Sequence, residues 1–208
     1  MIKAKHNGLV YPFFKWYAGF IIKRHYGTVR IVGEFTDREL PVLLLSNHIS
    51  WWDGFWAMYI NQKVLHRKFH FMMLEKQLRK YWFFRYTGGF SVRKQSKSVV
   101  ESLNYAAELL TKSENMVLLF PQGEIHSLHN QNITFERGVE RLLMNKEKGV
   151  QVLFLVNLVD YFSHRKPGIY LYLREYTDGA FDLAAIEQSY RAFYAEAVGK
   201  QSTLNRNP

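Results

Sequence analysis

His48 and Asp53 are the two residues of this 208-residue chain whose types and spacing favour proton-transfer chemistry. They follow an apolar run, Val42 to Leu45, which is typical of a buried strand. On one continuous helix, residues five apart would point about 140° apart, so the pair can meet only if a helix begins between them. Ser50 and Asp53 fit a capping box with Trp51 as the first helical residue, and this places a helix start at the required point.

An aspartate beside a histidine has a definite chemical consequence. If Asp53 accepts the N–H of one ring nitrogen of His48, the other nitrogen keeps a free lone pair and can take a proton from a hydroxyl group. Loops at the carboxyl ends of strands are also where α/β sheets place their sites. The alternative is that Asp53 only caps a helix and His48 is structural. We favour His48 as a general base that Asp53 orients.

Short apolar runs alternate with segments of helical period along the chain. This pattern predicts an α/β fold with a single domain, in which helices flank a central mixed, largely parallel sheet. The candidate strands are Val29 to Val32, Val42 to Leu45, His70 to Leu74, Gly89 to Val92, Met116 to Phe120, Val152 to Val156 and Ile169 to Leu173. The candidate helices that cover the sheet span residues 99–110, 135–143 and 183–197.

The N-terminal part of the chain contains a further apolar segment, Leu9 to Ile22, which Lys15 alone interrupts and which basic residues flank on both sides. As a helix it would be roughly 21 Å long, too short for a hydrocarbon core of about 30 Å. We therefore expect residues 1–27 to form a helical segment at the membrane interface and residues 28–208 to form the main domain. A plain core helix is the alternative. The expected location is the cytoplasmic face of a membrane, peripheral or monotopic.

The net charge of +10 is concentrated between Lys63 and Lys97, where ten Lys and Arg residues accompany one acid, Glu75. Aromatic residues are interleaved with these bases, a mixture that suits an anionic membrane surface or a nucleic acid. Binding to either one without catalysis is the alternative function, but it would leave His48 and Asp53 unexplained. We expect a membrane partner and no nucleic-acid partner. The chain has no cysteine, so an acyl-thiol intermediate on the protein is excluded.

Three short motifs occur in order along the chain. The first is Asn47-His48 followed by Asp53, the second runs from Gly88 to Arg93, and the third runs from Phe120 to Glu124. In order and spacing they resemble the signature blocks of the glycerolipid acyltransferases related to 1-acylglycerol-3-phosphate acyltransferase. With a weaker fourth block, the resemblance covers about Val42 to Asn157.

The resemblance implies a reaction in which an acyl group passes from a thioester, on coenzyme A or acyl carrier protein, to the hydroxyl of a lysolipid or related lipid. Neither a cofactor nor a metal is implied. His48 and Asp53 would be catalytic, and Arg93 would bind a substrate phosphate. The other implied substrate-binding residues are Asn47, Gln122, Gly123 and Glu124, and the turn at Gly123 is a place where we expect exposed backbone N–H groups.

The third motif departs from the family pattern. Gln122 replaces the usual Glu, Glu124 the usual Thr and Ile125 the usual Arg, so one phosphate-binding guanidinium is missing. We therefore expect an acceptor other than lysophosphatidic acid. The alternative is that Arg93 and Arg137 together bind a phosphate.

A cluster of Glu124, His126 and His129 raises the possibility of a metal hydrolase. Two histidines at i and i+3 can share a helix face, but the sequence contains none of the zinc signatures. We therefore expect no metal site.

Overall fold

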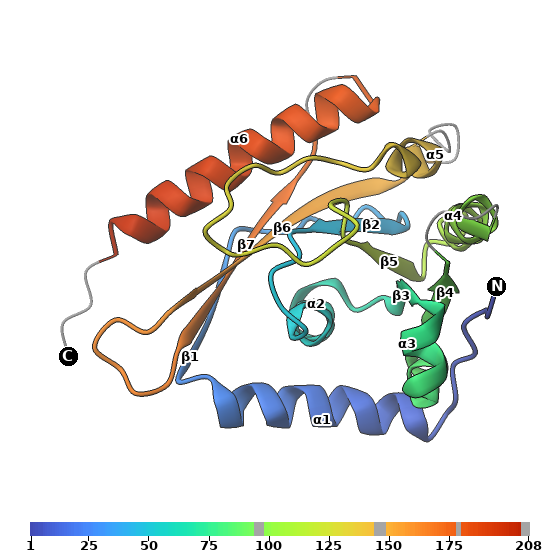
Figure 1. The fold of residues 1–208 in the computed structure, drawn as a ribbon, viewed down its shortest axis with the longest axis horizontal. Helices are drawn as coiled ribbons and strands as arrows, with labels where there is room; N and C mark the ends of the chain where they lie inside the picture. Colours follow the sequence, from blue (N-terminus) through green and yellow to red (C-terminus); the bar gives the residue numbers. More distant parts are fainter. Residues whose placement is uncertain (94–97, 144–148, 178–179, 205–208) are drawn as a thin grey trace.

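The computed structural model describes residues 1–93, 98–143, 149–177 and 180–204, and in them a single seven-stranded sheet (Figure 1). The strand order is β1-β7-β6-β2-β5-β3-β4, and every neighbouring pair is parallel except β6 and β7. The strands are β1 (Thr28–Val32), β2 (Val42–Ser46), β3 (Lys68–Leu74), β4 (Gly89–Val92), β5 (Asn115–Leu119), β6 (Gln151–Asp160) and β7 (Gly168–Glu175). The predicted mixed, largely parallel α/β sheet is confirmed.

The helices differ more from expectation than the strands do. They are α1 (Val10–His25), α2 (Asp53–Ile60), the π-helix η1 (Asn61–Leu65), α3 (Glu75–Lys80), the 3₁₀ helix η2 (Trp82–Thr87), α4 (Ser98–Leu109), the 3₁₀ helix η3 (Arg137–Val139), α5 (Glu140–Leu143) and α6 (Leu183–Ser202). The segment 135–143 is helical only from Arg137, and α3 and η2 were not predicted. Both are too short to show a helical period clearly in sequence.

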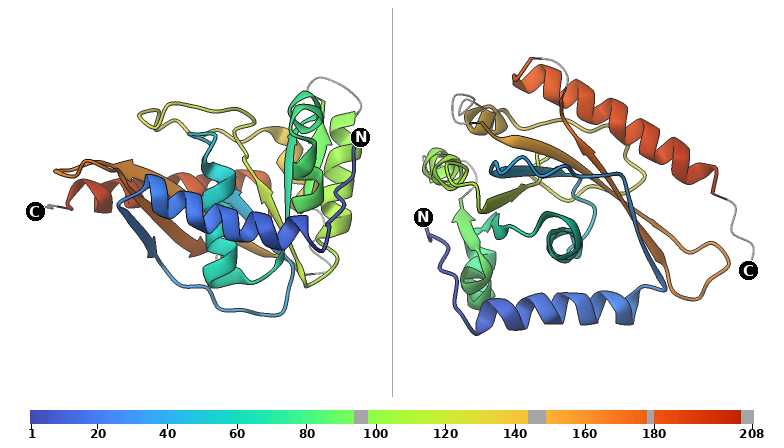
Figure 2. Two further views of the ribbon diagram at one scale, coloured as in Figure 1. Left: turned by 90° about the horizontal axis from the view of Figure 1, so that it is seen from below. Right: turned by 180° about the vertical axis from the view of Figure 1, so that it is seen from behind.

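Helices cover both faces of the sheet (Figures 1 and 2). On one face α1 crosses α2, and α4, α5 and α6 cover the other. Successive side chains of a strand point to opposite faces, so the central strands contribute to two separate cores. In β2, Leu43 and Leu45 join the core under α4 and α6, whereas Val42 and Leu44 join the core under α1 and α2. Burial on both faces explains the continuous apolar run of β2.

The N-terminal helix α1 occupies the predicted apolar segment and ends two residues before β1 begins at Thr28. Its Ala18 and Ile22 are fully buried against the core that contains α2. The division into segments 1–27 and 28–208 stays a prediction. Within the described part of the chain, no helix is both long enough and apolar enough to cross a membrane.

The sheet brings the three predicted motifs to one edge. Strands β2 and β3 each pair in parallel with β5, and β4 pairs in parallel with β3, so their carboxyl ends all point the same way. His48 lies just after β2, Arg93 follows β4 and Phe120 follows β5. Three segments that are distant in sequence therefore meet where each strand ends.

Candidate active site

His48 and Asp53 are in direct contact. The Nδ1 atom of His48 lies 2.7 Å from Oδ2 of Asp53, whose side chain is fully buried, while 22% of the His48 side chain is exposed. Helix α2 begins at Asp53, two residues later than predicted, after a turn at Trp51 and Trp52. The helix therefore does start between the two residues, as their contact requires.

The Asp53 carboxylate also holds the turn before α2. Its Oδ2 accepts from the backbone N–H groups of Ile49 at 2.8 Å and Ser50 at 3.0 Å, as the glutamate of a capping box would. The other half of the predicted box is absent, because Ser50 Oγ accepts from the N–H of Trp52 and not from that of Asp53. The carboxylate therefore serves the helix start and the histidine together.

The hydrogen bonds around Asp53 fix the tautomer of His48. Burial raises the pKa of Asp53, and the bonds from His48, Ser50 and Ile49 oppose this rise. The backbone N–H groups of Ile49 and Ser50 already donate to Oδ2, and an ionised carboxylate can only accept, so its 2.7 Å contact with His48 requires an N–H at Nδ1. His48 consequently carries its proton on Nδ1 and leaves the Nε2 lone pair free. This is the state that a general base requires.

Residues of the loop after β5 also contact His48, through both its ring and its backbone. The ring of Phe120 stacks on the imidazole with a centroid distance of 4.0 Å and an interplanar angle of 10°. Gln122 Oε1 accepts the backbone N–H of His48 at 2.8 Å, and the backbone N–H of His126 donates to the His48 carbonyl oxygen, also at 2.8 Å. Gln122 is therefore brought to the catalytic pair, where it contacts the histidine backbone.

Gly123 adopts a backbone conformation that other residues rarely take. Its φ is +72°, and a Cβ there would lie 3.0 Å from Cγ of Glu136, so a side chain would meet both strain and crowding. We expected this turn to expose its N–H group. The expectation is wrong for Gly123 itself, whose N–H donates to the Phe120 carbonyl oxygen at 3.0 Å and closes the turn.

A large cavity of about 820 Å³ opens beside His48. Most of its wall is apolar, with phenylalanines such as Phe69 and Phe71 and with methionines contributed by α2 and β3. Helix α1 also contributes, through Phe14 and Ala18. The charged side chains on the described wall are those of Glu124 and Glu136; none of the described lysines or arginines lines it. The cavity suits a long apolar chain whose polar end meets His48.

Arg93 lies beside this cavity and is bound to a carboxylate. Its Nε and Nη2 atoms donate to the two oxygens of Glu75, each at 2.8 Å, and Arg79 donates to the same carboxylate. Hydrogen bonds from Arg93 and Arg79 lower the pKa of Glu75 to about 2, so the carboxylate is charged at neutral pH. The structure thus places Arg93 in a bidentate ion pair within the protein. The neighbouring basic residues Lys94 and Lys97 lie outside the described residues.

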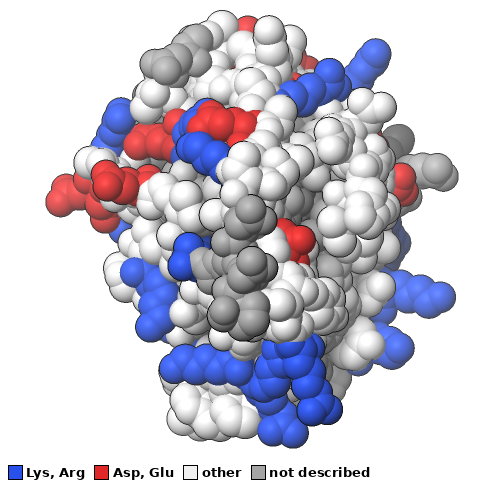
Figure 3. Space-filling model, turned by 90° about the vertical axis from the view of Figure 1, so that its left-hand side faces the viewer, with Lys and Arg blue, Asp and Glu red and all other residues white. Residues whose placement is uncertain are grey.

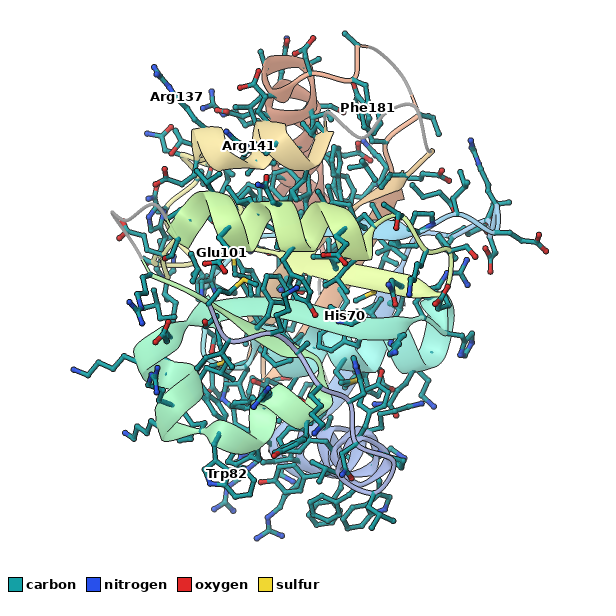
Figure 4. All side chains as sticks on the ribbon, turned by 90° about the vertical axis from the view of Figure 1, so that its right-hand side faces the viewer. His70, Trp82, Glu101, Arg137, Arg141 and Phe181 are labelled. Carbon is teal, nitrogen blue, oxygen red and sulfur yellow. The ribbon has the colours of Figure 1, made fainter. Side chains whose placement is uncertain are left out.

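Arg137 and Asn47 lie away from the cavity wall. Arg137 is exposed and points outward at the edge of the molecule (Figure 4), although its neighbours Glu136 and Gly138 line the cavity. Asn47 is fully buried, and its side-chain amide exchanges two hydrogen bonds with the backbone of Asn157 on β6. Asn47 therefore fixes the end of β2 against its neighbour.

Sequence reasoning missed two residues of this site. Glu75 was noted only as an isolated acid, yet it binds Arg93; the signal would have been its position directly after a strand. His126 was considered only as a possible metal ligand, yet its ring contacts Gln122 Nε2 at 3.0 Å and Glu124 Oε1 at 3.2 Å. Among the described residues, no group of three or more His, Cys, Asp or Glu side chains is arranged to hold a metal ion.

Comparison with known protein families gives one match. Residues 20–157, more than half of the chain, match the family described as Acyltransferase. The matched region includes His48, Asp53, Arg93 and the loop from Phe120 to His126. No curated protein is matched by the chain.

Proposed function

Because this chain belongs to the glycerolipid acyltransferase family, we propose that it transfers a fatty acyl group from a thioester to the hydroxyl of a lipid, with His48 as the general base. The observation that carries the proposal is the 2.7 Å contact between His48 and Asp53 at the wall of the apolar cavity. The contact leaves one ring nitrogen free to take a proton, and the cavity offers a place for the acyl chain.

The reaction needs one proton to move twice. His48 Nε2 takes the proton of the acceptor hydroxyl as its oxygen attacks the thioester carbonyl carbon. The tetrahedral intermediate then collapses, the C–S bond breaks, and the imidazolium returns the proton to the leaving thiolate. Asp53 stabilises the imidazolium that exists between these steps. Coenzyme A and acyl carrier protein are the proposed carriers of the acyl group, and the chain itself supplies no cofactor.

The kinetic pattern tests whether transfer is direct. The chain has no cysteine, and the one hydroxyl side chain on the described cavity wall, that of Thr87, donates to the Phe84 carbonyl oxygen, so we expect both substrates to bind before reaction. Initial-rate lines for varied thioester and varied lysolipid should intersect. Parallel lines, or an acylated protein trapped and seen by mass spectrometry, would contradict direct transfer.

One face of α1 carries exposed apolar side chains. Leu9, Phe13, Trp16 and Phe20 recur at helical spacing and are each at least half exposed, whereas Ala18 on the inner side is buried. Trp82 of η2 points outward at the same end of the molecule (Figure 4). Figure 3 shows Lys and Arg side chains gathered near the end of α1, whose last turn contains Lys23 and Arg24. These features support our proposal that α1 lies in a membrane surface, on the cytoplasmic side.

Vesicle flotation tests this membrane proposal. We expect the protein to float with anionic vesicles and more weakly with neutral ones, because each Lys or Arg near an anionic surface contributes about 1 kcal/mol. Replacing Trp16 and Phe20 with serine should lower the bound fraction several-fold at any salt concentration, while added salt should weaken only the charge-dependent part. Val100→Ser, at an exposed apolar residue of α4 on the opposite face of the sheet, is the matched control and should bind normally.

Two outcomes of the flotation experiment would overturn the proposal. One is equal flotation of the Trp16/Phe20 variant and the wild type. The other is strong, salt-sensitive retention of RNA or DNA in a parallel filter-binding assay without vesicle binding, which would favour the nucleic-acid function.

We also expect the protein to discriminate between acceptor lipids by their headgroups. The described cavity wall carries Glu124 and Glu136 and no described Lys or Arg, while Arg93 is bound to Glu75. A phosphate monoester there would lack a bidentate partner, whereas hydroxyl or amino groups could donate to the carboxylates. We expect kcat/KM for a lyso-aminolipid or glycolipid to exceed that for lysophosphatidic acid by about tenfold or more, since hydrogen bonds to charged groups contribute about 1.5–3 kcal/mol.

Two variants in the loop after β5, one on the cavity wall and one off it, test this prediction. Ile125→Arg places a guanidinium on the cavity wall and should raise kcat/KM for lysophosphatidic acid, whereas Leu128→Arg, at an exposed position off the wall, should not. A wild-type preference for lysophosphatidic acid that disappears in Arg93→Ala would contradict this expectation and favour phosphate binding by Arg93.

A further inference from the structure

The orientation of the Gln122 side chain is fixed by its two neighbours. The backbone N–H of His48 can only donate, so Gln122 must present its Oε1 atom there, at 2.8 Å. Its Nε2 atom then faces Nδ1 of His126 at 3.0 Å. Because an amide nitrogen is a donor, the Nδ1 atom of His126 must accept, and it carries no proton.

The same tautomer satisfies the other ring nitrogen. A neutral His126 without a proton on Nδ1 has its proton on Nε2, which faces Oε1 of Glu124 at 3.2 Å. A second amide nitrogen, Nδ2 of Asn130, lies 3.5 Å from Nδ1 and also favours an acceptor at that atom. The surroundings of the neutral His126 ring therefore favour the tautomer that carries its proton on Nε2.

His126 also holds His48 through its own backbone. Its N–H donates to the His48 carbonyl oxygen at 2.8 Å, while Gln122 accepts the His48 N–H. The loop after β5 thus binds both polar backbone groups of His48. The orientation of the His48 ring therefore depends on these two backbone hydrogen bonds as well as on its contact with Asp53.

We propose that neutral His126 is a positioning residue, which fixes the Gln122 amide so that the amide holds His48 in its reactive orientation. This inference rests on the proposed function of His48 as the base. When His126 takes a second proton, an N–H at Nδ1 faces the Gln122 NH₂ group, and two donors meet. The Gln122 amide must then turn away or flip, and a flip would place its NH₂ group against the His48 N–H.

The pH dependence of the activity also depends on the titratable groups near His126. Glu124 faces Nε2 from the same loop, and Glu136 packs on the turn at Gly123 from the segment before η3. His48 and its partner Asp53 face the loop from the β2 side. His48 and Asp53 must also stay unprotonated for catalysis, so the acid loss of activity should contain the protonation of His126 in addition to that of the His48–Asp53 pair.

Two substitutions separate the positioning role from simple packing. His126→Leu removes the acceptor, and we expect kcat to fall about tenfold with KM changed less than twofold, because a small displacement of a catalytic group slows the chemical step. His126→Asn can present an amide oxygen near the Nδ1 position at every pH, so kcat should stay within threefold of wild type. The acid fall of its rate should also involve one proton fewer than the acid fall of the wild-type rate.

NMR measurements without substrate test directly whether His126 fixes the Gln122 amide. In NMR spectra of uniformly ¹⁵N-labelled protein at neutral pH, Nδ1 of His126 should lack a proton and Nε2 should carry one. The Gln122 side-chain amide signals should shift when His126 takes up its second proton. A proton on Nδ1 at neutral pH, or amide signals that do not respond, would overturn the proposal. So would a kcat of wild-type size in folded His126→Leu.

The outcomes distinguish this inference from the proposed function. Full activity in His48→Ala would remove the catalytic proposal, yet the NMR spectra would still decide whether His126 holds the Gln122 amide. If His126→Leu does not fold, the number of protons in the acid limb of wild type and His126→Asn decides the inference, and identical limbs would overturn it.

Discussion

His48→Ala is expected to lower turnover by at least about 10²-fold while the fold remains intact, because general-base catalysis contributes about 10² to 10⁴ in rate. The lone pair on Nε2 disappears with the ring, and none of the other described residues on the cavity wall is a histidine paired with a buried carboxylate. The measurement is kcat at saturating thioester and lysolipid, with circular dichroism and thermal unfolding to confirm the fold.

The matched control for this variant is His164→Ala. His164 lies in the exposed loop between β6 and β7 and is not among the residues that line the cavity, so its removal should leave kcat unchanged. A His48→Ala protein that keeps more than about a tenth of wild-type turnover would be incompatible with a base of this strength.

Asp53→Asn is expected to reduce kcat by about 10³-fold or more, because it removes the negative charge beside His48. His48 Nδ1 and the backbone N–H groups of Ile49 and Ser50 all bond to Oδ2, so an asparagine that presents its oxygen there keeps these contacts. The neutral amide stabilises much less the imidazolium that forms when His48 takes the hydroxyl proton. A buried aspartate that orients a catalytic histidine has an effect of about 10⁴ when changed to asparagine in the serine-protease triad.

The control for Asp53→Asn separates chemistry from helix capping. Ser50→Ala removes the hydroxyl that accepts from Trp52 but keeps the carboxylate, so it should lower stability by about 1 kcal/mol and leave kcat nearly unchanged. Equal losses of kcat in the two variants would show that the turn before α2, and not the charge on Asp53, determines the loss of activity.

Much of the fold was predictable because its signals are local. The apolar runs of the seven strands and the start of a helix between His48 and Asp53 both depend on neighbouring residues. The exact start of α2 was not predictable, because a turn at Trp51 and Trp52 looks in sequence like a first helical turn.

The pairing of Arg93 with Glu75 could not be predicted because it depends on strand order. Strands β3 and β4 pair in parallel, with Leu74 opposite Val92, so the residue that follows each strand lies beside the other. Eighteen positions separate the two in sequence, and only the register brings them together. The backbone hydrogen bond from His126 to His48 has the same origin, since it depends on β2 and β5 being neighbours in the sheet.

One side of helix α1 lines the cavity and another side faces outward, and this affects which truncations the protein can tolerate. Phe14 and Ala18 line the cavity, while Phe13 and Trp16 face outward on the same helix. A chain cut before β1 to improve solubility would therefore also lose a wall of the cavity and open its apolar interior to water. Solubility is better sought by changing the outer side chains one at a time, since these contribute nothing to the lining.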